Sequence, residues 1–473
     1  MKDRLTVLAN SPIKGNVLYI SMRDLRLLNN HCIHYAYNLS YHYQSQMFIG
    51  VPIKDIKCND VQYSLILENI EDLRKESIKQ NLYLTILDNV NTFVKTNKIK
   101  NIILDWSPLR EHIAFCNNIK DLCTKDKLFC IQIDSHNIVP CKILDVYKRT
   151  SSSVKIQLFK HFFEYLNEYD DLQLEKSVND SNFTSKNMKF IINAWDTLEP
   201  HKFNDKKKVS SFKCNIPKYE PAKYYQGTYS AGLKVMDDFF NNKFHIYNEC
   251  RNNPDVDGLS NLSPYIHLGI LSPQKIIKLA YEKFYKKDKD NLDGYVAEIF
   301  IWRETSEHFC YHNKDYDNIM GALEWARDSL HEHAKDEREH LYTKEELEFG
   351  KTNDSFWNAA ENQLLKLNKI HGYVRMYWAK QLVKWTKTPE EAVKIGIELN
   401  DKYSIDGNDP NGYTGVMWCI CGTMDRGYKD RDITGKIRPL NAPKTKHYEK
   451  LWNDEKETEK YLKTKLINRT ENN

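Results

Sequence analysis

The sequence predicts two domains, an N-terminal α/β domain with a largely parallel, Rossmann-like sheet and an all-helical C-terminal domain. Three observations support this prediction. Strand patterns alternate with helical patterns through residues 1–190, a polar and lysine-rich stretch follows at 191–228, and helical periodicity dominates residues 229–473. We therefore expect residues 191–228 to link the two domains.

Five apolar runs in the first domain have the length and composition of buried strands. They are NVLYIS at 16–21, QMFIGVPI at 46–53, LYLTIL at 82–87, NIILDW at 101–106 and FCIQID at 129–134. Residues 61–80 and 88–98 have helical patterns. Strands that alternate with helices favour parallel pairing, because a parallel connection needs a crossover long enough to hold a helix.

In the second domain the helical pattern is interrupted by loops that we place at Pro254, Pro264, Pro273, Pro389 and Pro410. One helical segment, GYVRMYWAKQLVKW, carries Trp378 and Trp385 seven residues apart. On a helix this spacing puts the two indoles nearly in line, with a rise of ~10 Å. It suits electron hopping between indoles, but it is equally typical of an ordinary buried apolar stripe.

Composition excludes several classes of protein. The chain has 473 residues, of which 41% are hydrophobic and 12% aromatic, enough for real cores. The N-terminus lacks the apolar core of a signal peptide and no apolar run could cross a bilayer, so we expect an intracellular protein, cytoplasmic or nuclear, without a membrane anchor. The asparagine-, lysine- and isoleucine-rich composition indicates an AT-rich genome, such as that of a virus or a parasite.

Motifs for other chemistries are missing from the sequence. The 11 cysteines are scattered and form neither zinc-type pairs nor a disulfide framework, which favours a reducing compartment and no metal site. There is no Walker A motif and no dinucleotide GxGxxG, which argues against ATP- or NAD-driven chemistry. The net charge of +4 is too small to indicate a nucleic-acid ligand by itself. Basic side chains do cluster between Arg426 and Lys446, and this local excess suits either a phosphate backbone or a solvated surface loop.

A series of collinear motifs carries more information than composition. It comprises YISMRDLRLLNN at 19–30, IDSHNIVP at 133–140, NLSPYIHLG at 261–269, AEIFIWRE at 297–304, GALEWARDSL at 321–330, KDEREHLYT at 335–343, RMYWAK at 375–380, LND at 399–401, DGNDPNGYTGVMW at 406–418 and DRGYKDRDITGKIR at 425–438. Together these segments resemble the class II cyclobutane pyrimidine dimer photolyases of the photolyase/cryptochrome family. The resemblance implies light-driven repair of ultraviolet-damaged double-stranded DNA by a monomer, with an electron from excited, reduced FAD splitting a flipped-out dimer.

The resemblance also implies which residues hold FAD in the helical domain. They are Asn261, Leu262 and Ser263 at the pyrophosphate, the salt bridge of Arg375 with Asp406 beside the flavin ring, Asn400 facing flavin N5, and Asp409 and Asn411 near the ribityl or adenine part. Without the resemblance these residues have plain structural interpretations: a Ser-Pro helix start, a structural salt bridge and, for Asn400, a helix cap. An antenna chromophore such as a deazaflavin occurs in some relatives, and the sequence leaves its presence here open.

Further roles are implied for the tryptophans and for the substrate site. Photoactivation is assigned to Trp378 nearest the flavin, Trp357 in the middle and Trp385 at the surface end. The active-site floor is assigned to Glu298, Trp302, Met376 and Trp418, with Glu298 bonding a pyrimidine and the two indoles stacking on the extruded bases. In the alternative interpretation AEIFIWRE is an amphipathic helix with Glu298 exposed. The residues expected to contact DNA are Arg426, Lys429, Arg431, Lys436 and Arg438.

Two departures from the family pattern lie outside these assignments. Asn408 stands where an arginine is expected, and Pro439-Leu440 stands where an aromatic residue is common. Three rival functions stay open: a cryptochrome-like signalling flavoprotein, a photolyase for the (6-4) photoproduct, and a non-catalytic damage-binding protein. Glu298, Trp302, Trp418 and the basic segment argue against signalling, and the motifs favour the dimer enzymes over the (6-4) enzymes.

Overall fold

In the computed structural model, residues 2–167 and 205–470 are described. The α/β domain contains one six-stranded sheet in the order β1-β6-β5-β2-β3-β4. All pairs are parallel except β1 with β6, which is antiparallel. The strands are β1 (Leu5–Ala9), β2 (Asn16–Ile20), β3 (Met47–Val51), β4 (Tyr83–Ile86), β5 (Ile99–Asp105) and β6 (Phe129–Ile133).

The five strands predicted from apolar runs are confirmed, and β1 is the strand that the sequence did not reveal. Strands β3 and β6 are buried at every position, because helices cover both faces of a parallel sheet. By contrast, β1 lies at the edge, and its Val7 is 36% exposed. The apolar run in this strand, Val7, Leu8 and Ala9, is too short to distinguish a strand from a loop.

Helices α1 (His31–His42), α2 (Asp60–Lys79), α3 (Val90–Thr96) and α4 (Arg110–Asp126) connect or flank the strands. The helices predicted at 61–80 and 88–98 correspond to α2 and α3. A capping box between Asn59 and Gln62 fixes the start of α2. Helix α1 was missed because ten of its twelve residues are buried, which leaves no polar face to give a helical period.

The segments around the predicted linker pack against both domains. Helix α5 (Ser151–Leu166) falls within the range predicted for the first domain, yet its Phe162 contacts Phe300 of the helical domain at 4.6 Å between ring centroids. Helix α6 (Lys206–Ser211) lies in the predicted linker and buries Val209 in the α/β domain. The predicted boundary at residue 190 itself lies outside the described residues.

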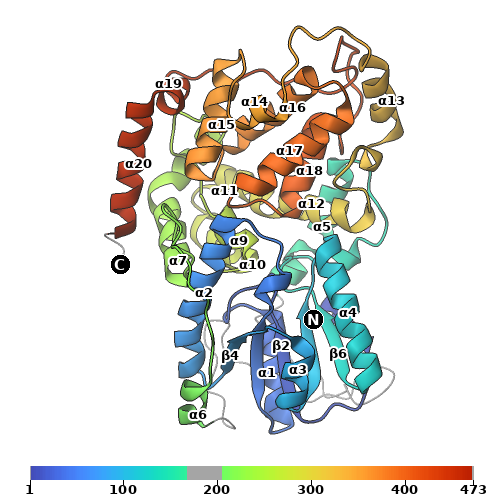
Figure 1. The fold of residues 1–473 in the computed structure, drawn as a ribbon, viewed down its shortest axis with the longest axis vertical. Coiled ribbons are helices and arrows are strands. Elements are labelled where there is room, and N and C mark those ends of the chain that lie inside the picture. The colour runs from blue at the N-terminus through green and yellow to red at the C-terminus, as the bar shows by residue number, and fades with distance from the viewer. Residues whose placement is uncertain (1, 168–204, 471–473) are drawn as a thin grey trace.

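The described residues from Tyr229 onward form helices and loops, as predicted (Figure 1). The helices are α7 (Tyr229–Asp238), α8 (Tyr247–Cys250), α9 (Ser263–His267), α10 (Pro273–Phe284), α11 (Lys289–Val296), α12 (Arg303–His312), α13 (Glu324–His333), α14 (Lys344–Glu348), α15 (Ser355–Leu367), α16 (Gly372–Trp385), α17 (Pro389–Tyr403), α18 (Pro410–Cys421), α19 (Tyr448–Asn453) and α20 (Glu455–Thr470). A π-helical segment, Ala297–Trp302, joins α11 to α12.

Four prolines that we placed in loops instead lie in the first turn of a helix. Pro273, Pro389 and Pro410 are the first residues of α10, α17 and α18, and Pro264 is the second residue of α9. Proline is tolerated there, since the first turn has no intrahelical partner for its missing N–H. Each of these prolines therefore marks where a helix begins.

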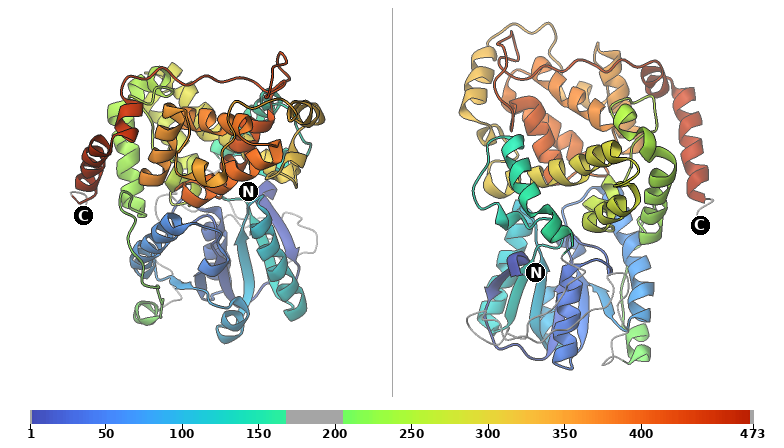
Figure 2. Two further views of the ribbon diagram at one scale, coloured as in Figure 1. Left: turned by 45° about the horizontal axis from the view of Figure 1, so that its top comes forward. Right: turned by 180° about the vertical axis from the view of Figure 1, so that it is seen from behind.

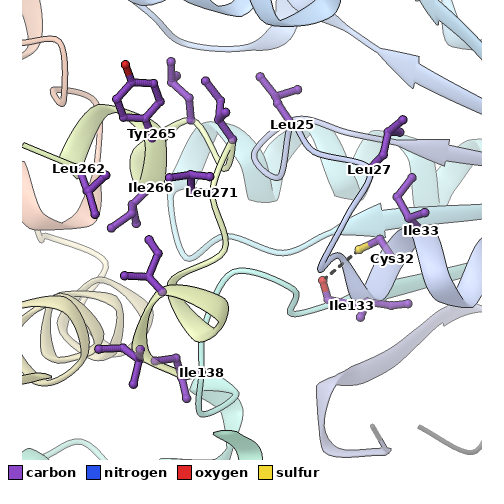
Figure 3. Close-up of a cluster of buried hydrophobic side chains, with 14 of the residues drawn as sticks. Leu25, Leu27, Cys32, Ile33, Ile133, Ile138, Leu262, Tyr265, Ile266 and Leu271 are labelled. Atoms are coloured by element: carbon purple, nitrogen blue, oxygen red, sulfur yellow. Dashed lines mark hydrogen bonds between the residues drawn. The ribbon is translucent and has the colours of Figure 1, made fainter. Parts of the chain in front are cut away.

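The two domains lie directly against each other (Figure 2), and one buried apolar cluster contains residues of both. Leu25 and Leu27, which follow β2, lie in the same buried cluster as Leu262, Ile266 and Leu271 of the helical domain (Figure 3). Buried charges also cross this boundary. Arg23 pairs with Glu307 of α12, and the backbone N–H of Val139 donates to Glu304 at 3.1 Å. These contacts hold the carboxyl ends of the strands against the helices that carry the predicted site.

Candidate active site

Two indoles form an open floor in the helical domain. Trp302 ends the π-helical segment and Trp418 lies on α18, and their rings meet nearly at right angles, 5.9 Å apart between centroids. Both are partly exposed, and Met376 on α16 is 39% exposed. Flat apolar side chains that remain accessible to solvent can receive another planar group by stacking.

Glu298 projects from the same π-helical segment as Trp302. Its side chain is 40% exposed, and its carboxylate pairs with Arg251, which follows α8. The surroundings bury the carboxyl group enough to raise the pKa of Glu298, although Arg251 acts in the opposite direction. Glu298 is therefore partly exposed and paired with a cation, which differs from the fully exposed glutamate of the amphipathic-helix interpretation. Arg251 is a member of the site that sequence reasoning missed, because 47 positions separate it from its partner.

Three of the residues predicted to hold the cofactor, Ser263, Arg375 and Asp406, meet around one partly buried ion pair. Arg375 Nη2 donates to Asp406 Oδ1 at 2.8 Å, so the expected salt bridge is present. Lys369 Nζ donates to Ser263 Oγ at 3.0 Å. Burial would raise the pKa of Asp406, but Arg375 and Lys369 more than offset this and lower it to about 2. Burial lowers the pKa of Lys369 to about 8, so Lys369 would gain from an anionic partner.

A cavity of about 670 Å³ opens beside Lys369. Asn261, at φ +55° in the left-handed region, lines it together with Lys369. Further lysines line the cavity at positions 234, 243 and 465. Ligand pockets of roughly 300–1,000 Å³ hold molecules of cofactor size. The volume, the lysines and the polar loop fit a dinucleotide with a pyrophosphate.

Some buried polar atoms near the ion pair lack a hydrogen-bond partner within the described part of the chain. They include Arg375 Nε, His371 Nε2 and Ser404 Oγ. Buried polar groups are normally paired, and His371 lines the cavity, so its unpaired nitrogen is consistent with a polar ligand there. Sequence reasoning missed Lys369, whose four-carbon stem reaches the first residue of α9, more than 100 positions earlier.

Asn400 lies inside α17, whose cap residues are Thr388 and Ser404. The helix-cap interpretation of Asn400 is therefore wrong. The side chain is 2% exposed and approaches α18 at Gly412, where a Cβ atom would lie 2.7 Å from Asn400 Nδ2. The glycine leaves the room that the amide occupies.

Asp409 and Asn411 lie at the start of α18. The Asp409 carboxylate caps the helix at the Asn411 N–H and pairs with His267 at 2.9 Å. Asn411 is exposed in the first turn. Asp409 thus has a full set of protein partners, and contact of either residue with a flavin stays a prediction.

The three predicted electron-transfer tryptophans form a continuous row. The rings of Trp378 and Trp357 are parallel within 6°, with centroids 6.1 Å apart, and Trp357 meets Trp385 at 5.3 Å and 83°. Trp385 is the most accessible, although it is only 7% exposed, against 1% for Trp378 and 0% for Trp357. The spatial order therefore agrees with the predicted order. The helical spacing within α16 did not reveal that Trp357 of α15 lies between the two indoles.

The predicted DNA-binding residues lie on the segment after α18. All five are exposed: Arg426, Lys429, Arg431, Lys436 and Arg438. The segment is nevertheless held firmly, since Ile437 is buried and the Lys436 N–H donates to Ser329 Oγ of α13 at 2.9 Å. Arg438 also lies over the ring of Tyr428 at 5.9 Å. Exposed cations on a fixed segment are expected of a site that binds a phosphate backbone. This arrangement favours that interpretation over a loosely solvated loop.

The crevice at the carboxyl ends of β2 and β5 is the usual place for a ligand on a doubly wound sheet. Here it holds a cavity of about 80 Å³, lined by Met22, Arg23, Ser107 and His112 among others. A molecule of deazaflavin size needs several times this volume. As it stands, this cavity is smaller than such a molecule.

The described residues contain no group of three or more potential ligands placed to hold a metal ion. Within those same residues, no helix combines the length and the apolar character required to span a bilayer. All 11 cysteines are free thiols, and eight of them are buried.

Comparisons with known proteins point in one direction. A deoxyribodipyrimidine photo-lyase from Potorous tridactylus is 34% identical over 90% of this chain and 77% of its own length. Enzymes of the same name from Arabidopsis thaliana and Oryza sativa are 33% and 32% identical, again over 90% of this chain, and cover 85% and 84% of their own lengths. No protein-family model matches the chain.

Solved structures agree on the fold. A class III photolyase from Agrobacterium tumefaciens superposes with a TM-score of 0.60 at 16% identity, covering 87% of this chain and 81% of its own. A cryptochrome from Synechocystis gives 0.65 at 14% identity, covering 95% of this chain and 88% of its own. At these identities the likeness concerns the fold alone.

Proposed function

Because the chain belongs to the deoxyribodipyrimidine photo-lyase family, with marsupial and plant relatives that fit class II, we propose that it uses light to split cyclobutane pyrimidine dimers in DNA. The observation that carries the proposal is the open floor of Trp302 and Trp418 with the paired Glu298 and Arg251 beside it. A signalling flavoprotein would have no need of an accessible floor with a carboxylate and a guanidinium.

FAD is the cofactor that the family implies, and in reduced form it would supply, after absorbing light, the electron that opens the cyclobutane ring. Lys369, Ser263 and Asn261 would hold the pyrophosphate; the contact of Lys369 with Ser263 and the cavity lined by Lys369 and Asn261 support this. The ion pair of Arg375 with Asp406 and the buried amide of Asn400 would hold the ring system.

The substrate site has separate groups for the two parts of a dimer. Trp302 and Trp418 offer apolar faces to the extruded bases, each worth ~1–3 kcal/mol. Glu298 can bond the N3 or the carbonyl of a pyrimidine, and its raised pKa favours the neutral form that donates a proton in a hydrogen bond. Arg251 must release Glu298 for this bond, which frees its guanidinium for a phosphate or a carbonyl oxygen.

The row of Trp378, Trp357 and Trp385 would carry an electron inward when the cofactor has become oxidised. The exposed cations at 426–438 would hold the duplex, with little dependence on sequence because they contact phosphates. The proposed partner is therefore ultraviolet-damaged double-stranded DNA, and we expect the enzyme to act as a monomer inside the cell.

The substrate class can be tested with three oligonucleotides that differ only in the lesion. One carries a single cyclobutane thymine dimer, one a (6-4) photoproduct and one no lesion. The chemically reduced holoenzyme should restore the first alone under near-ultraviolet light. Restoration of the (6-4) photoproduct instead would replace the proposal by its nearest rival.

A further inference from the structure

Trp378 has a neighbour that the proposed electron relay does not use. Glu361, on α15, is 0% exposed, and its Oε2 accepts a hydrogen bond of 2.6 Å from Trp378 Nε1. Its other oxygen, Oε1, has no hydrogen-bond partner within residues 2–167 and 205–470. Burying a carboxyl group whose one hydrogen bond comes from an indole N–H costs folding free energy, which suggests that Glu361 has a function.

The other groups around Glu361 do not neutralise it. Helix α14 contributes Glu348, whose charge further disfavours ionisation of Glu361. Glu348 already pairs with Lys402 and accepts a hydrogen bond from Tyr403, both of α17. From α16 the polar group that meets Glu361 is the indole N–H of Trp378 itself.

The next indole in the row is placed differently. Trp357 Nε1 donates to the backbone carbonyl of Trp378 at 2.9 Å. A carbonyl oxygen is a far weaker base than a carboxylate and cannot keep a proton. Of these two indoles, Trp378 is therefore the one whose N–H faces a group able to take the proton away.

Loss of an electron makes an indole cationic and its N–H strongly acidic. At a site 1% exposed, a cation without a counter-charge is expensive, since water cannot solvate it. A carboxylate 2.6 Å away removes this cost if the proton crosses the existing hydrogen bond.

We propose that Glu361 is the proton acceptor of Trp378: it takes the Nε1 proton when this indole is oxidised and returns it when the indole is reduced again. This step rests on the proposed function, because the electron leaves Trp378 for the light-excited flavin. The N–H bond of Trp378 breaks, an O–H bond forms on Glu361, and the pair becomes a neutral radical and a neutral acid. When Trp357 supplies an electron, the proton goes back and the carboxylate is restored.

The step requires Glu361 to be ionised beforehand. Burial raises its pKa to about 8, which the Trp378 hydrogen bond opposes and Glu348 reinforces. The carboxylate would then be the minor form at pH 7 and the major form at pH 9. The proton-coupled route should open over this interval.

Transient absorption of the holoenzyme with oxidised flavin tests the step, since the indole radical cation and the neutral indole radical absorb at different wavelengths. In the wild type, the share of early neutral radical should rise severalfold from pH 7 to pH 9. Infrared difference spectra should show a protonated carboxyl group appearing with it. Glu361→Gln keeps the size and the acceptor oxygen but cannot take a proton, so its early radical should be the cation at every pH.

Two controls separate the causes. Trp378→Phe should remove the early radical, which assigns it to this indole. Glu398→Gln removes a carboxylate that pairs with Lys344 at the surface of the same domain, and should behave like the wild type. An early radical that is cationic at pH 9 in the wild type, or neutral in Glu361→Gln, would overturn the proposal. Absence of light-driven dimer repair by the chemically reduced wild type would instead overturn the proposed function, and this outcome is measured separately.

Discussion

A buried carboxyl group without a cation destabilises the fold once it must ionise, and Glu361 is such a group. Its folded pKa of about 8 lies above the ordinary value of 4.5, so between these values the folded chain binds more protons than the unfolded chain. The contribution of Glu361 is therefore present below pH 4.5 and is lost as the pH rises towards 8.

Glu361→Gln removes this dependence. We expect its free energy of unfolding, relative to the wild type, to increase between pH 5 and pH 8 by up to a few kcal/mol, since one pKa unit corresponds to ~1.4 kcal/mol. Urea unfolding of both proteins at several pH values measures the difference. A difference that stays constant with pH would mean that Glu361 titrates normally.

Some site residues could be predicted from the sequence and others could not. The three tryptophans and the Arg375–Asp406 pair were predicted through motifs, and their mutual placement in the structure agrees. Arg251, Lys369 and Glu361 were missed. Each has its partner on another element, so no local spacing in the sequence predicts the contact. The sequence also does not distinguish a buried glutamate such as Glu361 from an exposed one.

At the scale of elements, α17 and α18 meet at a glycine. Gly412→Ala would place a Cβ 2.7 Å from the buried Asn400 amide and push this side chain out of its position. We expect the variant to lose most of its FAD during purification, or to hold FAD with a shifted absorption spectrum. Absorbance at flavin and protein wavelengths measures the bound fraction.

Gly415→Ala is the matched control on the same helix. A Cβ there meets nothing within 4 Å, so FAD content should match the wild type and helix propensity should add up to ~1 kcal/mol of stability. Equal FAD loss in both variants would assign the effect to α18 itself and not to Asn400.

The basic segment after α18 is the second element with a testable role. Arg438→Ala should weaken binding to dimer-containing duplex more than to dimer-containing single strands, because the duplex offers more phosphates. It should also reduce the salt dependence of duplex binding by about one phosphate contact. Fluorescence anisotropy at several salt concentrations measures both.

Lys460→Ala on α20 is a control that removes an exposed cation elsewhere. It should leave binding to both substrates unchanged. If Arg438→Ala weakens binding to the duplex and to the single strand equally, Arg438 does not belong to the duplex interface.

Helices and strands were predicted correctly where their burial produces a clear pattern of apolar residues in the sequence. Parallel strands such as β3 and β6 are buried throughout and stand out as apolar runs. Burial on all sides also explains why α1 was not predicted: without a polar face, the helix has no helical period in its sequence. The edge strand β1 and the packing of α5 on the helical domain depend on contacts between distant segments, so a local pattern cannot supply them.

At the scale of the molecule, buried charges join the domains. Arg23 after β2 pairs with Glu307 of α12, with side chains 9% and 2% exposed. Arg23→Met would leave Glu307 buried and unpaired, and we expect a loss of ~3–5 kcal/mol in the free energy of unfolding. Thermal unfolding of the purified holoenzyme measures it.

The double variant Arg23→Met/Glu307→Met removes both charges and should recover part of this stability, since an apolar pair costs less than one unpaired charge. A double variant less stable than the single one would show that the loss in Arg23→Met does not come from the unpaired charge of Glu307.

The whole molecule combines an accessible aromatic floor, a cofactor-sized cavity and a row of indoles, and its central property should be repair that depends on light. The most direct measurement incubates the reduced holoenzyme with DNA carrying defined cyclobutane dimers, once in blue light and once in darkness, and counts the remaining dimers. We expect dimers to disappear in light only. Persistence of the dimers in light, with FAD bound and reduced, would contradict the assignment and favour a signalling or damage-binding protein.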